Sequence, residues 1–252
     1  MTSHTTRTRV LRVPAAVLAA AVLTAGCSFV GGGPRTTATA DATVTEAVAA
    51  VELTGVRSGS IEVTPGAGPG VTVRRTVHYR GATAPVPGQR VSGGVLTFTD
   101  GCSGDCRVDY RLEVPAAATV RLESASGRIA VTGVAGADLR ASSGDVTADR
   151  IAGPVRIRTS SGGITATALS AAQADVRSDS GDARLDFAQA PASVRAETSS
   201  GDLALEVPRA PYRLAVSTTS GDREIDLPDD SAAPSHLTAR TTSGDVRITA
   251  RG

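Results

Sequence analysis

The feature that most restricts the fold is a motif of serine followed by glycine, usually with aspartate next, which recurs along the second half of the chain. Successive glycines of this motif are 17, 18, 19, 20, 20 and 23 residues apart. Such a period is typical of architectures in which each repeat is one supersecondary unit. Fainter copies at Ser58-Gly59 and Ser92-Gly93 place the expected start of the repeat near residue 50. The glycines of the clear copies are Gly127, Gly144, Gly162, Gly181, Gly201, Gly221 and Gly244.

Within a unit, inward and outward residue types alternate as they do in a β-strand. Charged residues separate small or apolar ones from Val194 to Thr198, and apolar residues occupy every second position from Leu203 to Val207 after the bend. Each unit is therefore expected to be a strand, a Ser-Gly-Asp bend, a second strand and a second break. Glycine suits the bend because it adopts a positive φ at little cost, and Ser and Asp because their side chains bond turn backbone.

Two all-β architectures fit this pattern. In a single-chain β-solenoid each unit of about 17–20 residues is one coil, and coils stack into two sheets roughly 10 Å apart. In an antiparallel β-sandwich the bends would instead be hairpin turns, which gives successive units no reason to resemble each other. Only 2% of the residues are aromatic, which suits a narrow solenoid interior. We therefore favour the solenoid, with the repeat domain over residues 46–252 and its clearest repeats over 116–252.

The ends of a solenoid need protection because they expose unpaired strands. The last apolar strand in the sequence, Val246 to Thr249, is expected to be such an edge, and Arg247 and Arg251 are candidates to guard it.

The N-terminus has the pattern of an export signal. An apolar run from Val13 to Leu23 is too short to span a membrane as a helix, which needs about 20 residues. The run ends in Leu23-Thr24-Ala25-Gly26-Cys27, which resembles the bacterial lipobox, in which the Cys thiol is acylated before cleavage; Thr24 stands where the commonest lipobox has Leu. The basic residues that precede the run are Arg7, Arg9 and Arg12.

This pattern predicts a lipoprotein signal peptide over residues 1–26 and lipidation at Cys27. Residues 27–45 are rich in Gly, Thr, Ala and Pro and are expected to be a flexible tether. The expected location is the cell membrane, on its extracytoplasmic face, with the lipid at Cys27 as the membrane contact.

The other two cysteines, Cys102 and Cys106, form an even pair in an exported chain and predict a disulfide that closes a tight turn between strands. Metal binding is the competing interpretation. It would need further ligands, and His78 and His236, the histidines outside the signal, lie at no ligand-like spacing from the pair.

Several segments resemble a known family. Leu112-Glu113-Val114-Pro115, then Val120 to Ser124 and Ser126-Gly127, the Ser-Gly-Asp series, and Glu206-Val207-Pro208 are similar to the bacterial putative-adhesin family of β-strand-repeat domains, a domain of unknown function found in lipoproteins and envelope proteins. The resemblance covers roughly residues 50 to 252. It implies an adhesion-related role by name and brings no catalytic residues.

The sequence gives little support to enzymatic or metal-dependent chemistry, so we expect no catalytic residues, no metal and no cofactor. It has no Gly-x-Ser-x-Gly elbow, and two histidines leave few possible catalytic triads. A polysaccharide-acting enzyme is the remote alternative, weakened by the absence of Lys. Stacked bend aspartates such as Asp182 and Asp202 raise the possibility of calcium binding, but one carboxylate per coil is a poor set of ligands, so turn capping is the favoured role.

The formal net charge of +1 provides no bulk field that would favour nucleic acid. The pairs Arg74-Arg75 and Arg156 with Arg158 are interpreted as solvated strand faces, and no nucleic-acid partner is expected. The tyrosines are expected to be strand residues with solvent-exposed hydroxyls. They are Tyr79, Tyr110 and Tyr212.

Two function classes remain. One is a non-enzymatic adhesin-like or scaffold module that contacts wall polymers or other surfaces through exposed polar ladders. The other is an accessory lipoprotein that docks a specific envelope or membrane protein, for example in stress signalling. A contiguous apolar patch on one sheet would favour the protein partner, and a uniformly polar surface would favour the scaffold.

Overall fold

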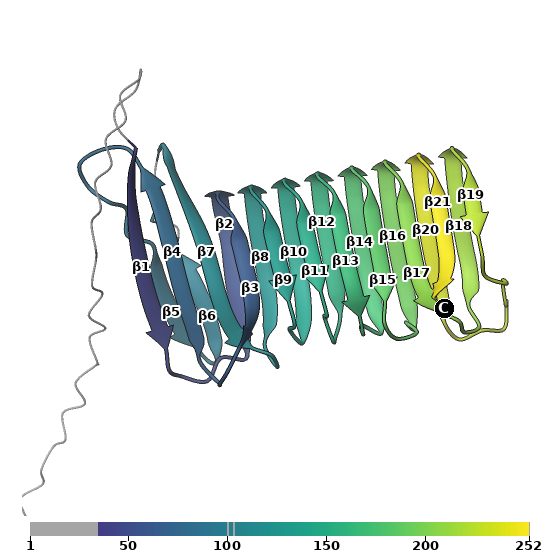
Figure 1. Ribbon diagram of the computed structural model, residues 1–252, viewed down its shortest axis with the longest axis horizontal. Helices are drawn as coiled ribbons and strands as arrows, with labels where there is room; N and C mark the ends of the chain where they lie inside the picture. Colours follow the sequence, from purple (N-terminus) through teal and green to yellow (C-terminus); the bar gives the residue numbers. More distant parts are fainter. Residues whose placement is uncertain (1–34, 100, 103, 252) are drawn as a thin grey trace, which may run out of the picture.

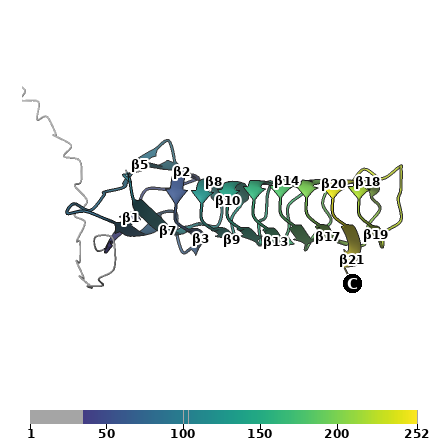
Figure 2. The same cartoon turned by 90° about the horizontal axis from the view of Figure 1, so that it is seen from above.

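The computed structural model describes residues 35–99, 101–102 and 104–251, and every regular element in these ranges is a β-strand. No helix in them is long and apolar enough to cross a membrane. The strands form an eleven-stranded and a ten-stranded sheet that lie face to face in one elongated body (Figures 1 and 2). The expected all-β solenoid is thereby confirmed.

Each coil contributes one strand to each sheet, and the bend glycine lies between the two strands. The pairing between neighbouring coils is parallel, which distinguishes a solenoid from the antiparallel sandwich. In the ten-stranded sheet the coil strands are β2 (Ala50–Ser58), β8 (Thr119–Ser126), β10 (Gly136–Ser143), β12 (Val155–Ser161), β14 (Gln173–Ser180), β16 (Ser193–Ser200), β18 (Arg213–Ser220) and β20 (His236–Ser243). In the eleven-stranded sheet they are β3 (Ile61–Gly66), β9 (Ile129–Thr132), β11 (Val146–Asp149), β13 (Ile164–Leu169), β15 (Ala183–Phe187), β17 (Leu203–Pro208), β19 (Arg223–Ile225) and β21 (Val246–Arg251).

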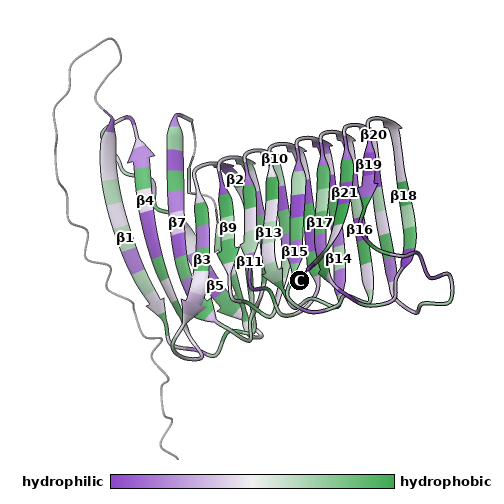
Figure 3. Ribbon diagram, turned by 45° about the vertical axis from the view of Figure 1, so that its right-hand side comes forward, coloured by the Kyte–Doolittle hydropathy of each residue, from purple (hydrophilic) through white to green (hydrophobic). Residues whose placement is uncertain are grey.

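The core consists of apolar side chains stacked in register from coil to coil. Leu122 pairs with Leu139, which pairs with Ile157, and all three are fully buried. The period-two alternation directs every second residue of a strand into this core, and hydropathic bands alternate along the strands in Figure 3. Medium-sized aliphatic residues fill the narrow space between the sheets, as the low aromatic content predicted.

The bend glycines lie in one column along the edge of the stack, and two constraints require glycine there. Gly162 has a φ of +136°, in the region that other residues adopt only at a cost. In addition, a Cβ at Gly162 would lie 2.3 Å from the carbonyl oxygen of Gly144 in the neighbouring coil. Gly59 belongs to the same column, because a Cβ at Gly127 would lie 2.1 Å from its oxygen. The repeat therefore does begin near residue 50.

The last two coils do not stack in sequence order. Strand β20 pairs with β16 on one side and β18 on the other, and β21 likewise lies between β17 and β19. Figure 1 shows this exchange, with the C-terminal yellow strands inside the yellow-green β18 and β19. The expectation that the strand beginning at Val246 is an edge guarded by Arg247 and Arg251 is therefore wrong, because β21 has a partner on both sides.

The exchange follows from the side chains of the two units. In β20 and β21 the inward positions hold apolar residues, including Leu237 and Ile248, which are fully buried. In β19 the inward register position paired with Val246 holds Arg223, which is exposed. A unit with an inward arginine is tolerated only at the end of the stack, where one side of the coil meets solvent.

Strands outside the repeat close the N-terminal end of the solenoid. Here β1 and β7 flank β4 in antiparallel pairs, while β5 and β6 form an antiparallel hairpin beside β2. The turn of that hairpin is Ser92-Gly93-Gly94, so the faint copy of the motif at Ser92-Gly93 is not part of the bend column. These strands are β1 (Thr36–Val44), β4 (Val71–Tyr79), β5 (Gly88–Ser92), β6 (Val95–Thr99) and β7 (Cys106–Pro115).

The expected tether over 27–45 is wrong for its second half, because residues 36–44 form strand β1. Small residues alternate there with Thr and Asp, so that Ala38 and Ala42 are partly buried while Thr39 and Thr43 are exposed. The composition of this segment is typical of a linker, but its pairing with β4 stabilises it as a strand.

Two further expectations about side chains are corrected. Arg75 is not a solvated face residue: it occupies an inward position of β4, is 6% exposed, and its guanidinium lies 5.4 Å from the centroid of the Phe98 ring. Burial lowers the pKa of Arg75, against a smaller opposing effect of Tyr110. The tyrosines are buried rather than solvent-exposed, and the Tyr212 hydroxyl donates a 2.9 Å hydrogen bond to the Pro208 carbonyl.

Candidate binding surfaces

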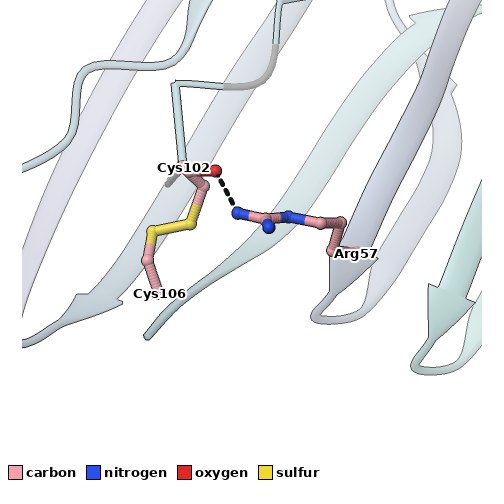
Figure 4. The surroundings of a disulfide bond; sticks show 3 residues. All are labelled: Arg57, Cys102 and Cys106. Carbon is pink, nitrogen blue, oxygen red and sulfur yellow. Dashed lines mark hydrogen bonds between the residues drawn. A yellow bond between two sulfur atoms is a disulfide. The ribbon is translucent and has the colours of Figure 1, made fainter. Parts of the chain in front are cut away.

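The disulfide prediction is confirmed. Cys102, in the loop after β6, is bonded to Cys106, the first residue of β7, and their Cα atoms are 5.6 Å apart. The Arg57 guanidinium donates a hydrogen bond to the Cys102 carbonyl and ties the loop to β2 (Figure 4). The bridge thus closes a short turn, and the Arg57 hydrogen bond connects this turn to the first coil. Cys27, the predicted lipidation site, lies outside the described residues.

The bend aspartates form a ladder of hydrogen bonds along the eleven-stranded sheet. The Asp182 carboxylate accepts a 2.8 Å bond from the Asp202 backbone N–H, Asp202 does the same for Asp245, and Asp245 for Asp222. The expected local turn capping is thus replaced by bonding between coils, because these carboxylates accept hydrogen bonds from the bend backbone of the neighbouring coil. Across the described ranges, no three His, Cys, Asp or Glu side chains are grouped so that they could hold a metal ion.

The histidines do not meet. His78 lies on β4 and His236 on β20, near opposite ends of the body (Figure 1). The His78 Nε2 is 3.1 Å from an Asp109 oxygen, and its Nδ1 is 3.2 Å from the Thr37 hydroxyl. Burial raises the pKa of Asp109, but hydrogen bonds from Ser60 and the nearby positive charges outweigh it, so this pKa lies below its usual value. The network joins β1, β4 and β7 and supports a structural role.

The outward face of the ten-stranded sheet carries two rows of charges that run along the stack. In the first row, acidic and basic residues alternate from strand to strand, so every charge has opposite charges beside it. A groove of about 660 Å³ follows this row. We call it the ladder groove, and its charged residues are Glu52, Arg121, Asp138, Arg156, Asp175 and Arg195.

The second row breaks the alternation. Arg140, Arg158 and Arg177 are register neighbours on β10, β12 and β14, with Glu123 before them and Glu197 after them. A groove of about 390 Å³ runs beside the arginines, and its other wall includes the exposed Ser142 and Ser160. We call this the arginine groove, lined by Glu123, Ser124, Arg140, Ala141, Ser142, Arg158, Thr159, Ser160, Arg177 and Asp179.

The sequence of a single strand does not show these rows, but the spacing between the charged residues and the bend glycine does. The arginines of the second row stand four residues before the bend glycine of their unit, as Arg140 does before Gly144. From Arg121 onward the first row stands six residues before it, as Asp138 does, whereas Glu52 stands seven residues before Gly59 because β2 has a register shift. Aligning the units on the bend glycine shows both rows, because parallel pairing without a shift makes that spacing a position on the face.

The eleven-stranded sheet carries a groove of different charge. It has a volume of about 610 Å³ and runs beside the aspartate ladder. Acidic residues outnumber the arginines that line it, Arg184 and Arg247. This groove is therefore acidic, unlike the arginine groove of the other sheet.

Large apolar residues are scarce on the surface. In the described ranges only Val86 and Ile225 are exposed large hydrophobic residues, at 83% and 39% exposure, and they lie at opposite ends of the molecule. The outward faces of both sheets are polar. The described surface therefore has no contiguous apolar patch.

Comparison with known proteins gives similarities in fold and family. Among solved structures, the chain is similar to a putative adhesin from Bacteroides fragilis, with a TM-score of 0.47 and 11% identity over 85% of this chain and 97% of that one. It is also similar to a putative cell adhesion protein from Clostridium sporogenes, with a TM-score of 0.41 and 10% identity over 84% of this chain and 99% of that one. No match was found among curated proteins.

The family comparison covers most of the repeat domain. Residues 90–250 match the family described as Toastrack DUF4097, and this range is more than half of the 252-residue chain. It includes all the Ser-Gly bends from Gly127 to Gly244 and both charged rows from β8 onward. The chain belongs to the Toastrack DUF4097 family.

Proposed function

We propose that the protein is a lipid-anchored, extracytoplasmic, non-enzymatic module that binds envelope or surface components through the polar faces of its solenoid. The observation that carries this proposal is the surface itself: two long faces with charged and hydroxyl side chains and with grooves that run along the stack of coils. A face of this kind suits an extended ligand, because its chemistry repeats from coil to coil.

The proposal of an anchor rests on the sequence at Cys27 and its flanks. A lipid there would hold the described domain close to the membrane, because β1 begins at Thr36, a few residues after the lipidated Cys. The N-terminal strands would then face the membrane side and the exchanged coils would point away. The bend column and the grooves run along the axis between these two ends.

The alternative is an accessory protein that docks one membrane or envelope protein. An obligate protein interface normally has an apolar core, and exposed apolar residues are scarce in the described ranges. The polar faces therefore favour the scaffold or adhesin-like role.

Crosslinking on intact cells tests the proposal directly. Tagged wild-type protein and Cys27→Ala are compared for membrane retention, and everything that co-purifies is identified. We expect the wild type to stay with the membrane and to recover wall polymer, while Cys27→Ala is released. One dominant protein partner that disappears in the Cys27→Ala sample would instead establish the docking role, and equal membrane retention of both forms would refute the anchor.

A further inference from the structure

The strongest unassigned feature is the run of three adjacent arginines on the ten-stranded sheet. Like charges directly opposite each other on neighbouring strands destabilise a sheet. In the ladder groove of the same sheet every charge is compensated by its neighbours, so the fold can alternate charges and does so there. A row that departs from this rule at Arg140, Arg158 and Arg177 has a cost that folding alone does not explain.

All three arginines have acidic partners in the ladder groove, and the Arg177 Nε is also 3.4 Å from an oxygen of Glu197 at the end of the row. The Arg158 guanidinium is 3.5 Å from an Asp175 oxygen, and the Arg177 Nε is 3.3 Å from the other oxygen of the same carboxylate. Arg140 similarly has its Nε 3.5 Å from Asp138. Because each guanidinium has five N–H donors, these contacts leave donors directed elsewhere. The arginine side chains remain 37–43% exposed.

The other side of the row is the arginine groove. In its middle section the charged wall is arginine and the opposite wall carries the hydroxyls of Ser142 and Ser160. Glu123 stands at one end on β8, and Asp179 stands at the other end on β14, next to Ser160 in the wall opposite Arg177. Guanidinium and hydroxyl donors facing each other across a groove are suited to phosphate, sulfate or carboxylate groups, which accept several hydrogen bonds at once. The section of the groove between Arg140 and Arg158 is therefore free of carboxylates, and Arg177 at its end faces Asp179.

We propose that the arginine groove binds a linear anionic polymer, with successive anionic groups held by Arg140, Arg158 and Arg177. This deepens the proposed function, on which it rests, by naming the ligand class and the site. The strand spacing of about 4.8 Å places three guanidinium groups over roughly 10 Å along the solenoid axis. A thread that follows this axis contacts the arginine row and avoids the carboxylates of Asp138 and Asp175.

The same geometry disfavours two other anionic ligands. A flat anionic membrane would meet the whole face, including its acidic residues, and gain little net attraction. Nucleic acid would find no aromatic side chain on which to stack a base, because none lines the groove. The ligand chemistry is therefore a repeated anionic group on a flexible backbone.

The test compares two triple variants of the full chain in a Cys27→Ala background. Arg140→Gln, Arg158→Gln and Arg177→Gln together empty the arginine groove of positive charge. Their matched control is Arg121→Gln, Arg156→Gln and Arg195→Gln, which removes the same charge from the ladder groove of the same sheet. Binding to immobilised linear polyphosphate and to polygalacturonate is measured at several salt concentrations, and circular dichroism checks that each variant is folded. The single variant Arg158→Gln provides the same comparison should a triple variant unfold.

We expect the arginine-groove triple variant to lose at least tenfold in affinity, and the slope of log affinity against log salt to fall by roughly 2–3. The ladder-groove triple variant should lose less than about threefold, because each of its arginines is compensated by acidic neighbours. Equal losses in the two triple variants would overturn the site.

Two further outcomes would overturn the ligand class. One is binding of the wild type to vesicles of phosphatidylglycerol and phosphatidylcholine with none to either polymer. The other is no binding of the wild type to any of these probes. Neither outcome touches the proposed function, since crosslinking on intact cells reports surface binding whatever its chemistry.

Discussion

The backbone N–H of Asp245 donates a 2.8 Å hydrogen bond to the carboxylate of Asp202, which lies 43 residues earlier in the chain. The preceding bond of the aspartate ladder, between Asp182 and Asp202, joins two units that are consecutive in the sequence. The Asp202–Asp245 bond therefore marks the place where the stack skips the unit of Gly221 and continues with the C-terminal unit. The skipped unit returns on the outside, where the Asp222 N–H bonds the Asp245 carboxylate.

The exchanged order of the last coils can be tested with paired cysteines. Arg195, Thr238 and Ala215 are register partners on β16, β20 and β18. Arg195→Cys with Thr238→Cys places two thiols on adjacent strands, whereas Arg195→Cys with Ala215→Cys places them two strands apart, beyond the reach of a disulfide. We expect mild oxidation to crosslink the first pair and not the second, as read by mass spectrometry. The reverse result would mean that the coils stack in sequence order.

Two adjacent glycines offer a matched test of the bend. Gly162→Ala forces a side chain into a positive φ and against the Gly144 carbonyl oxygen, and it should destabilise the protein by about 3 kcal/mol or more. At Gly163 the nearest atom to an added Cβ is 3.6 Å away, so Gly163→Ala should change stability by less than about 1 kcal/mol. Urea unfolding of the two variants provides the comparison, and similar losses in both would contradict the role assigned to the column.

The stability that the aspartate ladder contributes should depend on its hydrogen-bond acceptors rather than on its negative charges. Asp202→Ala removes the acceptor for the Asp245 N–H and should lower the free energy of unfolding by about 1 kcal/mol. Asp202→Asn keeps an acceptor oxygen and should leave the free energy of unfolding almost unchanged, as measured by urea unfolding.

Calcium should have no effect on the ladder. The midpoint of thermal unfolding should not change when calcium or a chelator is added to the wild type. A calcium-dependent midpoint that disappears in Asp202→Asn would show a cation site instead.

The N-terminal strands should lose stability in acid through Asp109. Its pKa in the folded protein lies below its ordinary value of 3.8, so the ionised form is favoured by folding. The corresponding stability is complete above the ordinary value and is lost as the pH falls from there through the folded pKa. Asp109→Asn should remove this part of the pH dependence and cost about 1–3 kcal/mol at pH 7.

Thermal unfolding from pH 3 to pH 7 checks this expectation. The exposed Asp179→Asn provides the control, because Asp179 lies on the far sheet and away from the His78 network. If Asp109→Asn kept the acid-dependent loss of the wild type, that loss would have to come from other carboxylates.

Arg223 should limit association at the C-terminal end of the stack. It occupies an inward register position of the outermost coil, beside the exposed Ile225. Arg223→Val would extend the apolar surface at an unpaired strand edge and should increase self-association with concentration, as measured by light scattering. Arg247→Val removes the same charge from the outward face of the neighbouring β21 and should have a smaller effect. Equal association of the two variants would show that charge alone, rather than the inward position, matters.

Local pattern was sufficient to predict the coil. The alternation from Val194 to Thr198 and the glycine at 201 specify strands and a bend through the residues themselves, because the period of a strand and a positive φ are local properties. The near-constant spacing then predicted that the coils stack, and the proximity of Cys102 and Cys106 in a chain with the pattern of an export signal predicted their bridge.

Only the tertiary structure decided which strands are neighbours. The local sequence of residues 36–44 fits a tether as well as the strand that pairs with β4. Likewise, the local sequence from Val246 to Arg251 does not show that β21 lies between β17 and β19. The arginine groove has the same origin, since Arg140, Arg158 and Arg177 become one row only when β10, β12 and β14 pair without a shift. The sequence of a strand determines which of its side chains point inward. Its neighbouring strands are determined by contacts between residues far apart in the chain, because the order of the coils depends on burying apolar side chains on both sides of each coil.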